Sequence, residues 1–331
     1  MTNHMRGLVA ILLLLLAACG PQTTETATPL VPAVMLLAGD SLAPINPALV
    51  SGPIEITGSS TVYPLTARVA EEFALEGSPA QIDVKVTGTG GGFRSFCSGD
   101  PVDIVNASRP ITPAETDACR AVGREPLGFQ VGIDALAVVV SNENQFVERL
   151  SFAQLAQIFS GQVRTWREVD PTYPDAPISL FSPGVDSGTF DYFVEAVLGG
   201  DEALIPAVPG VVLSEDDTEL LRGIEENPFA IGYFGFAYYQ SDQERLRALA
   251  IDGGNGPVAP GAATVVDGSY PLARPLFIYT SSATLAQDPT VAAFISYYLQ
   301  NVNELVVEVG YFPVPATTID AAQQALVAAL R

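Results

Sequence analysis

From Pro53 onward, short runs rich in β-branched residues alternate with segments of helical periodicity, and this alternation limits the folds open to the chain. In residues 82–86, apolar side chains occupy every second position, which predicts a strand. Before it, Leu65, Val69 and Phe73 recur at four-residue spacing, which predicts one face of a helix. Strands that alternate with helices in this way predict an α/β architecture.

The alternation continues to the C-terminus. Further strands are predicted at 53–56, 135–140, 178–181, 231–239 and 276–279, and further helices at 151–159, 189–198, 290–299 and 321–330. Roughly 280 ordered residues exceed what one hydrophobic core usually supports, so we expect two domains.

The N-terminus has the pattern of a bacterial lipoprotein signal. Arg6 precedes an apolar run, 8–18, that ends directly before Cys19. The run is shorter than the ~20 residues that span a bilayer. We therefore predict a signal peptide at 1–18 and lipidation of Cys19, which would anchor an extracytoplasmic protein to the membrane. An ordinary signal peptide with an incidental cysteine is the alternative. Residues 19–52, rich in Thr and Pro, are predicted to be a tether.

The composition excludes several classes of function. The chain carries 37 acidic against 15 basic residues, a net charge of −22, which does not suit nucleic acid or an anionic lipid surface. Its only histidine, His4, leaves with the signal peptide, so neither a Ser-His-Asp triad nor a histidine-ligated zinc is expected. Its only lysine, Lys85, is not part of a P-loop. We expect no enzyme, no cofactor and no metal.

Three polar turns, each between a predicted strand and a helix, are candidates for an anion site. They are Gly58-Ser59-Ser60-Thr61, residues 87–92 and Asp186-Ser187-Gly188-Thr189. In an open α/β sheet such turns lie at the carboxyl ends of the strands, where ligands bind. Helix N-termini and hydroxyl groups supply hydrogen-bond donors there, so three converging turns would bind an anion without lysine. For each turn alone, a simple helix cap is the alternative.

A fourth segment places Ser108 and Arg109 just before a capping box that runs from Thr112 to Glu115. The planar guanidinium of Arg109 is suited to binding an oxyanion through two parallel hydrogen bonds. The alternative is a surface arginine paired with a carboxylate.

At these segments the sequence resembles the phosphate-binding proteins of high-affinity phosphate-uptake ABC transporters, in particular the branch of cyanobacteria and related bacteria. The resemblance runs from about Ile54 to the C-terminus. It rests on five stretches in the same order, namely 58–65, 88–93, 106–111, 182–193 and 231–239.

The resemblance implies a type II periplasmic-binding-protein clamshell, with two lobes of mixed sheets flanked by helices and two inter-lobe crossings. The crossings are expected near 134–140 and 270–275. Lobe 1 would then comprise 53–137 and 270–331, and lobe 2 would comprise 138–269. The implied function is capture of inorganic phosphate for the permease of an ABC importer, by a monomer. A binding protein for sulfate, molybdate or a phosphonate, a secreted phosphohydrolase, and a sensory protein are the alternatives.

Matching positions suggest the phosphate ligands. Together with Ser108 and Arg109, they are Ser60, Thr61, Thr89, Asp186, Ser187, Gly188 and Thr189. Better-known members carry an arginine where this chain has Pro183, and an aspartate where it has Arg109. We therefore expect Arg109 to be the only full positive charge in the site, and Asp186 to accept the proton of phosphate.

Cys97 and Cys119 remain once Cys19 is assigned to lipid. An even pair in an oxidising compartment favours a disulfide, and the resemblance implies the same bridge. Two buried free thiols are the alternative.

Overall fold

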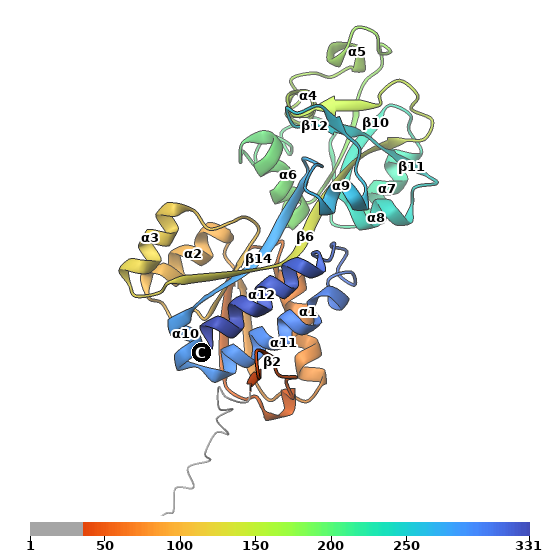
Figure 1. The fold of residues 1–331 in the computed structure, drawn as a ribbon. Coiled ribbons are helices and arrows are strands. Elements are labelled where there is room, and N and C mark those ends of the chain that lie inside the picture. The colour runs from red at the N-terminus through yellow and green to blue at the C-terminus, as the bar shows by residue number, and fades with distance from the viewer. Residues whose placement is uncertain (1–35) are drawn as a thin grey trace, which may run out of the picture.

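The structure is a computed structural model that describes residues 36–331. The predicted signal peptide at 1–18, the lipidation site Cys19 and the first part of the tether lie outside the described residues. The described chain forms two lobes. Figure 1 shows two long strands, β6 (Pro126–Ser141) and β14 (Ala273–Ser281), running from one lobe into the other.

Lobe 1 is built on the strand order β4-β3-β5-β14-β6. Strand β3 (Pro53–Gly58) pairs in parallel with β4 (Gln81–Val86) and β5 (Ile104–Ala107), whereas β14 is antiparallel to β5 and β6. The helices of this lobe are α1 (Tyr63–Leu75), α2 (Thr89–Ser98), α3 (Pro113–Ala121), α10 (Ser282–Gln287), α11 (Pro289–Leu305) and α12 (Ala316–Ala329).

Lobe 2 continues the same sheet through the C-terminal part of β6. Strand β10 (Ala230–Gly235) and β11 (Leu246–Ala248) pair antiparallel with β6, and β8 (Ser179–Pro183) lies parallel between β10 and β9 (Val212–Ser214). A small sheet contains β7 (Arg149–Ser151), β12 (Ala250–Asp252) and β13 (Pro257–Val258). The helices are α4 (Phe152–Phe159), α5 (Trp166–Val169), α6 (Gly188–Leu198), α7 (Asp217–Glu225), α8 (Phe236–Ser241) and α9 (Ala262–Val266).

Each lobe has its own hydrophobic core. Along β6, Val131 belongs to the core of lobe 1 and Ile133 to that of lobe 2. Near and along β14, Leu272 belongs to the core of lobe 2 and Leu276 to that of lobe 1. On each of the two strands, the chain therefore passes from one core to the other over a few residues. The side chains between those residues lie between the two cores.

The end of the predicted tether is packed against lobe 1. Leu36 and Val50 are buried in the core of lobe 1, and between them run β1 (Leu37–Ala38), β2 (Ser41–Leu42) and a short 3₁₀ helix, η2 (Pro47–Leu49). Because these apolar side chains leave water, the described part of 19–52 is folded onto the lobe rather than extended.

Several predicted elements have different bounds, and the strand predicted at 135–140 is the last part of the longer strand β6. The strand predicted at 231–239 ends at Gly235, and Phe236 begins helix α8. The change of direction buries Phe236, whose ring centroid lies 5.2 Å from that of Phe312. The helix predicted at 321–330 begins earlier, at Ala316.

Among residues 36–331, none of the helices combines the length and the apolar character that a membrane span requires.

Candidate anion-binding site

A cavity of about 310 Å³ is lined by residues of both lobes and of the crossing strand β14. Its lining residues are Ser59, Ser60, Thr61, Gly88, Thr89, Gly90, Ser108, Arg109, Asp191, Glu195 and Arg274. Hollows of about 450 and 430 Å³ elsewhere on the surface are larger, but none of the predicted ligands lines them. The predicted residues Ser60, Thr61, Thr89, Ser108 and Arg109 therefore meet in one cavity.

Two helices begin at this cavity, and neither has a side-chain cap. The N-cap residues are Val62 for α1 and Gly88 for α2, and neither makes a side-chain hydrogen bond to the helix start. The first N–H groups of a helix have no partner within the helix and carry a partial positive charge. A Cβ atom on Gly92 would lie 2.9 Å from the Cα of Gly58, so glycine lets α2 approach the first turn closely. The start of α2 is thus placed beside the first turn as a donor for an anion. At the start of α1, the N–H of Tyr63 already donates to the carbonyl of Ser59, and Pro64 has no N–H.

Hydroxyl groups surround these helix starts. Thr89 Oγ1 lies 3.1 Å from Ser108 Oγ and accepts a hydrogen bond of 3.1 Å from the backbone N–H of Ser108. Ser60 Oγ donates to Asp191 Oδ2 over 2.8 Å. Ser59, which also lines the cavity, is only 4% exposed. The cavity is therefore lined by hydroxyl groups from three different segments of lobe 1.

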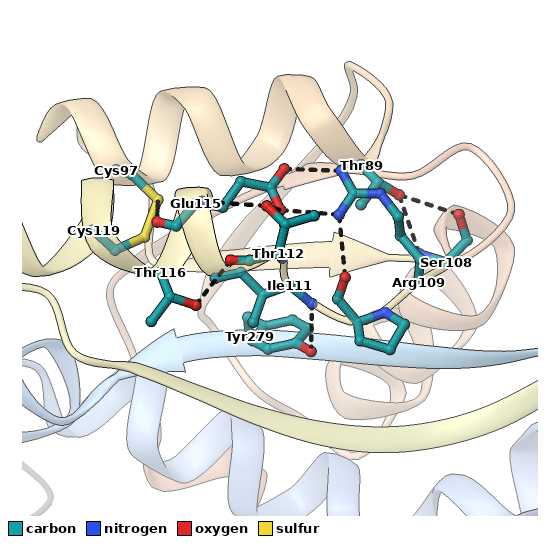
Figure 2. A network of polar contacts seen from close by, with 11 residues as sticks. Thr89, Cys97, Ser108, Arg109, Ile111, Thr112, Glu115, Thr116, Cys119 and Tyr279 are labelled. Atoms are coloured by element: carbon teal, nitrogen blue, oxygen red, sulfur yellow. Dashed lines mark hydrogen bonds and ion pairs between the residues drawn. A yellow bond between two sulfur atoms is a disulfide. The ribbon is translucent and has the colours of Figure 1, made fainter.

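Arg109 lines the cavity. Figure 2 shows that its guanidinium is held by Glu115. Its NH1 and NH2 groups donate to the two carboxylate oxygens of Glu115 over 2.9 and 2.8 Å. Thr112 completes the predicted capping box with the same carboxylate. The hydrogen bonds from Arg109 are the main reason that the pKa of Glu115 is lowered to about 2. Both interpretations of Arg109 thus have a basis, because it is paired with a carboxylate and it lines the cavity.

The third predicted turn closes against the first instead of lining the cavity. Ser187 caps helix α6, where its Oγ accepts from the N–H of Thr189 over 3.2 Å. The carbonyl of Gly188 accepts from Thr61 Oγ1 over 3.3 Å, and a Cβ on Gly188 would lie 3.0 Å from that oxygen. Asp186 is exposed, outside the cavity lining. The turn therefore joins the lobes.

Helix α6 presents two other acidic residues to the cavity. Asp191 and Glu195 are four residues apart and so share one face of the helix. The predicted proton acceptor, Asp186, precedes the helix cap and lies on the surface, whereas Asp191 lies one turn into the helix and faces lobe 1. The spacing of four residues can be recognised in a sequence, but the face of α6 that contacts lobe 1 cannot be.

Arg274 is a second guanidinium at the cavity, so Arg109 is not its only full positive charge. Arg274 is 7% exposed, and its Nε donates to Asp134 Oδ2 over 3.2 Å. Arg274 and Asp134 face each other in the register of β14 and β6. In the sequence, this ion pair is indicated by a single charged residue in each of the two crossings, whose other residues are apolar.

The surroundings of Arg274 are strongly desolvated. Its guanidinium carbon lies 3.8 Å from the ring centroid of Tyr192, a cation–π contact. Burial raises the pKa of Asp134, and the charge and hydrogen bond of Arg274 oppose that rise.

Within residues 36–331, no group of three His, Cys, Asp or Glu side chains is placed to hold a metal ion.

The expected disulfide joins Cys97 of α2 to Cys119 of α3, 22 residues apart (Figure 2). It confirms the predicted pairing. It links the helix that begins at Thr89 to the helix whose Glu115 binds Arg109, and both Thr89 and Arg109 line the cavity.

Two lobes, two crossing strands and a polar cavity between them define a two-lobed solute-binding protein. Residues 43–302 match the family model described as PBP superfamily domain. The chain is 42% identical to Protein SphX of Synechococcus elongatus, in an alignment that covers 86% of this chain and 84% of that protein. It is 32% identical to the phosphate-binding protein PstS of Staphylococcus saprophyticus, with 80% and 81% covered.

The fold is also similar to the crystal structure of a possible phosphate binding protein from Planctomyces limnophilus. The TM-score is 0.80 at 40% identity, and the match covers 85% of this chain and 100% of that one. The chain belongs to the PBP superfamily and, within it, to the family that includes SphX and the PstS phosphate-binding proteins.

Proposed function

We propose that this protein is the extracytoplasmic substrate-binding component of an ABC importer and that it captures inorganic phosphate in the cavity between its lobes. The observation that carries the proposal is the meeting of Ser60, Thr61, Thr89, Ser108 and Arg109 in one cavity. Family membership supports it, since a relative 32% identical over most of both chains is a phosphate-binding protein.

Binding would depend on short-range donors. At a net charge of −22, the whole protein repels an approaching dianion. The uncapped start of α2, the hydroxyl groups and the guanidinium of Arg109 act at hydrogen-bond distance, where they outweigh that repulsion. The cavity lining contains hydroxyl groups but no histidine to activate them, which favours binding without catalysis over a phosphohydrolase.

The acidic residues favour phosphate over sulfate and molybdate. Asp191 lines the cavity beside the hydroxyl of Ser60. A carboxylate accepts the proton that phosphate carries at neutral pH, whereas sulfate has no proton to donate and meets an unpaired like charge. We therefore assign the role of proton acceptor to Asp191 in place of Asp186.

Calorimetric titration of the mature, phosphate-stripped protein tests the proposal. We expect saturable heat with phosphate, and much weaker binding of sulfate and molybdate. Equal affinity for sulfate and phosphate would contradict the assignment of phosphate, and hydrolysis of a chromogenic phosphate ester would contradict a purely binding role.

The location follows from the N-terminal sequence and the family. We propose that residues 1–18 direct export and that lipid on Cys19 anchors the protein outside the cytoplasm. A monomer attached in this way would deliver phosphate to the permease of the importer.

A further inference from the structure

Arg274 contacts both lobes from the strand that joins them. Its NH2 group donates to Thr61 Oγ1 in lobe 1 and, over 3.2 Å, to the carbonyl of Gly188 in lobe 2. Its Nε is held by Asp134 on the other crossing strand. One guanidinium is therefore fixed at the crossings and bonded to a predicted ligand turn of each lobe.

One edge of this guanidinium is still available. Within the described chain, the contact of NH1 is an ion pair of 3.8 Å with Glu195 Oε2, which is beyond hydrogen-bond distance. The side chain of Glu195 is 62% exposed, against 8% for Arg274. An exposed partner at that distance is easily displaced, because it loses little when it returns to water. The NH1 donors therefore remain free for an anion in the cavity that Arg274 lines.

The contacts of NH2 depend on the position of the two lobes relative to each other. Thr61 and Gly188 come from different lobes, and they touch each other as well as Arg274. If the lobes separated, the buried NH2 group would lose at least one acceptor. Leaving a buried charged donor without a partner is costly, so NH2 favours the closed arrangement.

We propose that Arg274 binds the anion through NH1 and couples anion binding to closure of the lobes through NH2. This inference rests on the proposed function, since the anion is taken to be phosphate. An anion on NH1 adds a further contact to the planar guanidinium, and because its fork is rigid, that contact also holds NH2 in place against Thr61 and Gly188. Asp134 is a positioning residue that keeps the group at the crossings.

The test compares the wild-type protein with the double variant Asp134→Asn/Arg274→Gln. Removing Arg274 alone would leave Asp134 buried without a partner, which is strongly destabilising. The double variant replaces the ion pair with two neutral amides, so neither charge is left buried without its partner. Phosphate affinity is measured by calorimetry, and closure by the change in radius of gyration in X-ray scattering on addition of phosphate.

We expect the double variant to bind phosphate about tenfold to a hundredfold more weakly than the wild type, as when a hydrogen bond to a charged group is lost. We also expect it to show no phosphate-dependent contraction, whereas the wild type contracts. Equal affinity and equal contraction in the two proteins would overturn the inference and leave the proposed function intact. Failure of the wild-type protein to bind phosphate would overturn both.

Arg274→Lys keeps the test decisive if the double variant does not fold. Lysine retains the charge beside Asp134, but a single ammonium does not reproduce the guanidinium fork. We expect a folded protein with weakened phosphate binding and reduced contraction. Wild-type affinity together with full contraction in Arg274→Lys would contradict the coupling through NH2.

Discussion

The hydroxyl of Ser60 in lobe 1 donates a hydrogen bond of 2.8 Å to the carboxylate of Asp191 in lobe 2. Both residues line the anion cavity, so the pair places a negative charge where the ligand is expected. A carboxylate in an anion site is useful only if the ligand brings a proton to it, and this sets the first prediction.

Asp191→Asn is expected to reduce the preference for phosphate over sulfate by about tenfold or more, because the repulsion of sulfate by the carboxylate is lost. Asp186→Asn is the matched control, since Asp186 is exposed and outside the cavity lining. Competition titrations with the two anions measure both variants. An unchanged ratio in Asp191→Asn, or a changed ratio in the control, would contradict the assignment.

Thr61→Ala and Thr89→Ala should each weaken phosphate binding by about 1.5 to 3 kcal/mol, because each removes a hydroxyl that can bond to a charged ligand. Ser187→Ala should instead lower the free energy of unfolding by about 0.5 to 2 kcal/mol, since Ser187 caps α6. Calorimetry and urea unfolding separate the two effects. If Ser187→Ala weakens affinity as much as the threonine variants, the third turn contacts phosphate directly.

Arg109→Gln should weaken phosphate binding by about 1.5 to 3 kcal/mol without abolishing it, because Arg274 remains. The folded pKa of Glu115, about 2, is below its ordinary value of 4.5. The ion pair with Arg109 is therefore complete above pH 4.5, and its stabilisation is lost as the pH falls toward 2. The difference in affinity between wild type and Arg109→Gln should thus be constant from pH 5 to 8, as titrations at several pH values would show. Wild-type affinity in the variant would make Arg109 a surface residue.

Cys97→Ala/Cys119→Ala should lower the free energy of unfolding by roughly 3 kcal/mol, because the bridge closes a loop between residues 22 apart. Phosphate affinity should also fall, since α2 and α3 carry Thr89 and Glu115. Urea unfolding and calorimetry of the variant measure both. Unchanged stability would show that the bridge does not constrain the unfolded chain.

Cys19→Ser would remove the residue that is predicted to carry the lipid, and stable attachment requires more than one acyl chain on the N-terminus. The variant should therefore be released from the membrane fraction or remain unprocessed. Cell fractionation and intact mass of the wild-type protein decide this. A wholly soluble wild-type protein without lipid mass would refute the anchor.

Local patterns in the sequence were sufficient for much of the fold. The period-two run at 82–86 and the four-residue spacing from Leu65 to Phe73 correspond to β4 and α1, because strand and helix periods are properties of adjacent residues. The capping box from Thr112 to Glu115 is equally local and is present.

The sequence by itself determined the α/β alternation, the polar turns at strand ends and the pairing of the two cysteines that remain after Cys19. Only the tertiary structure decided which side chains meet in the cavity. Arg274 reaches Asp134 across 140 residues, and Ser60 reaches Asp191 across 131. Such contacts depend on the register of β6 with β14 and on which face of α6 meets lobe 1. Both are set by packing between distant segments, so no local period in the sequence reports them.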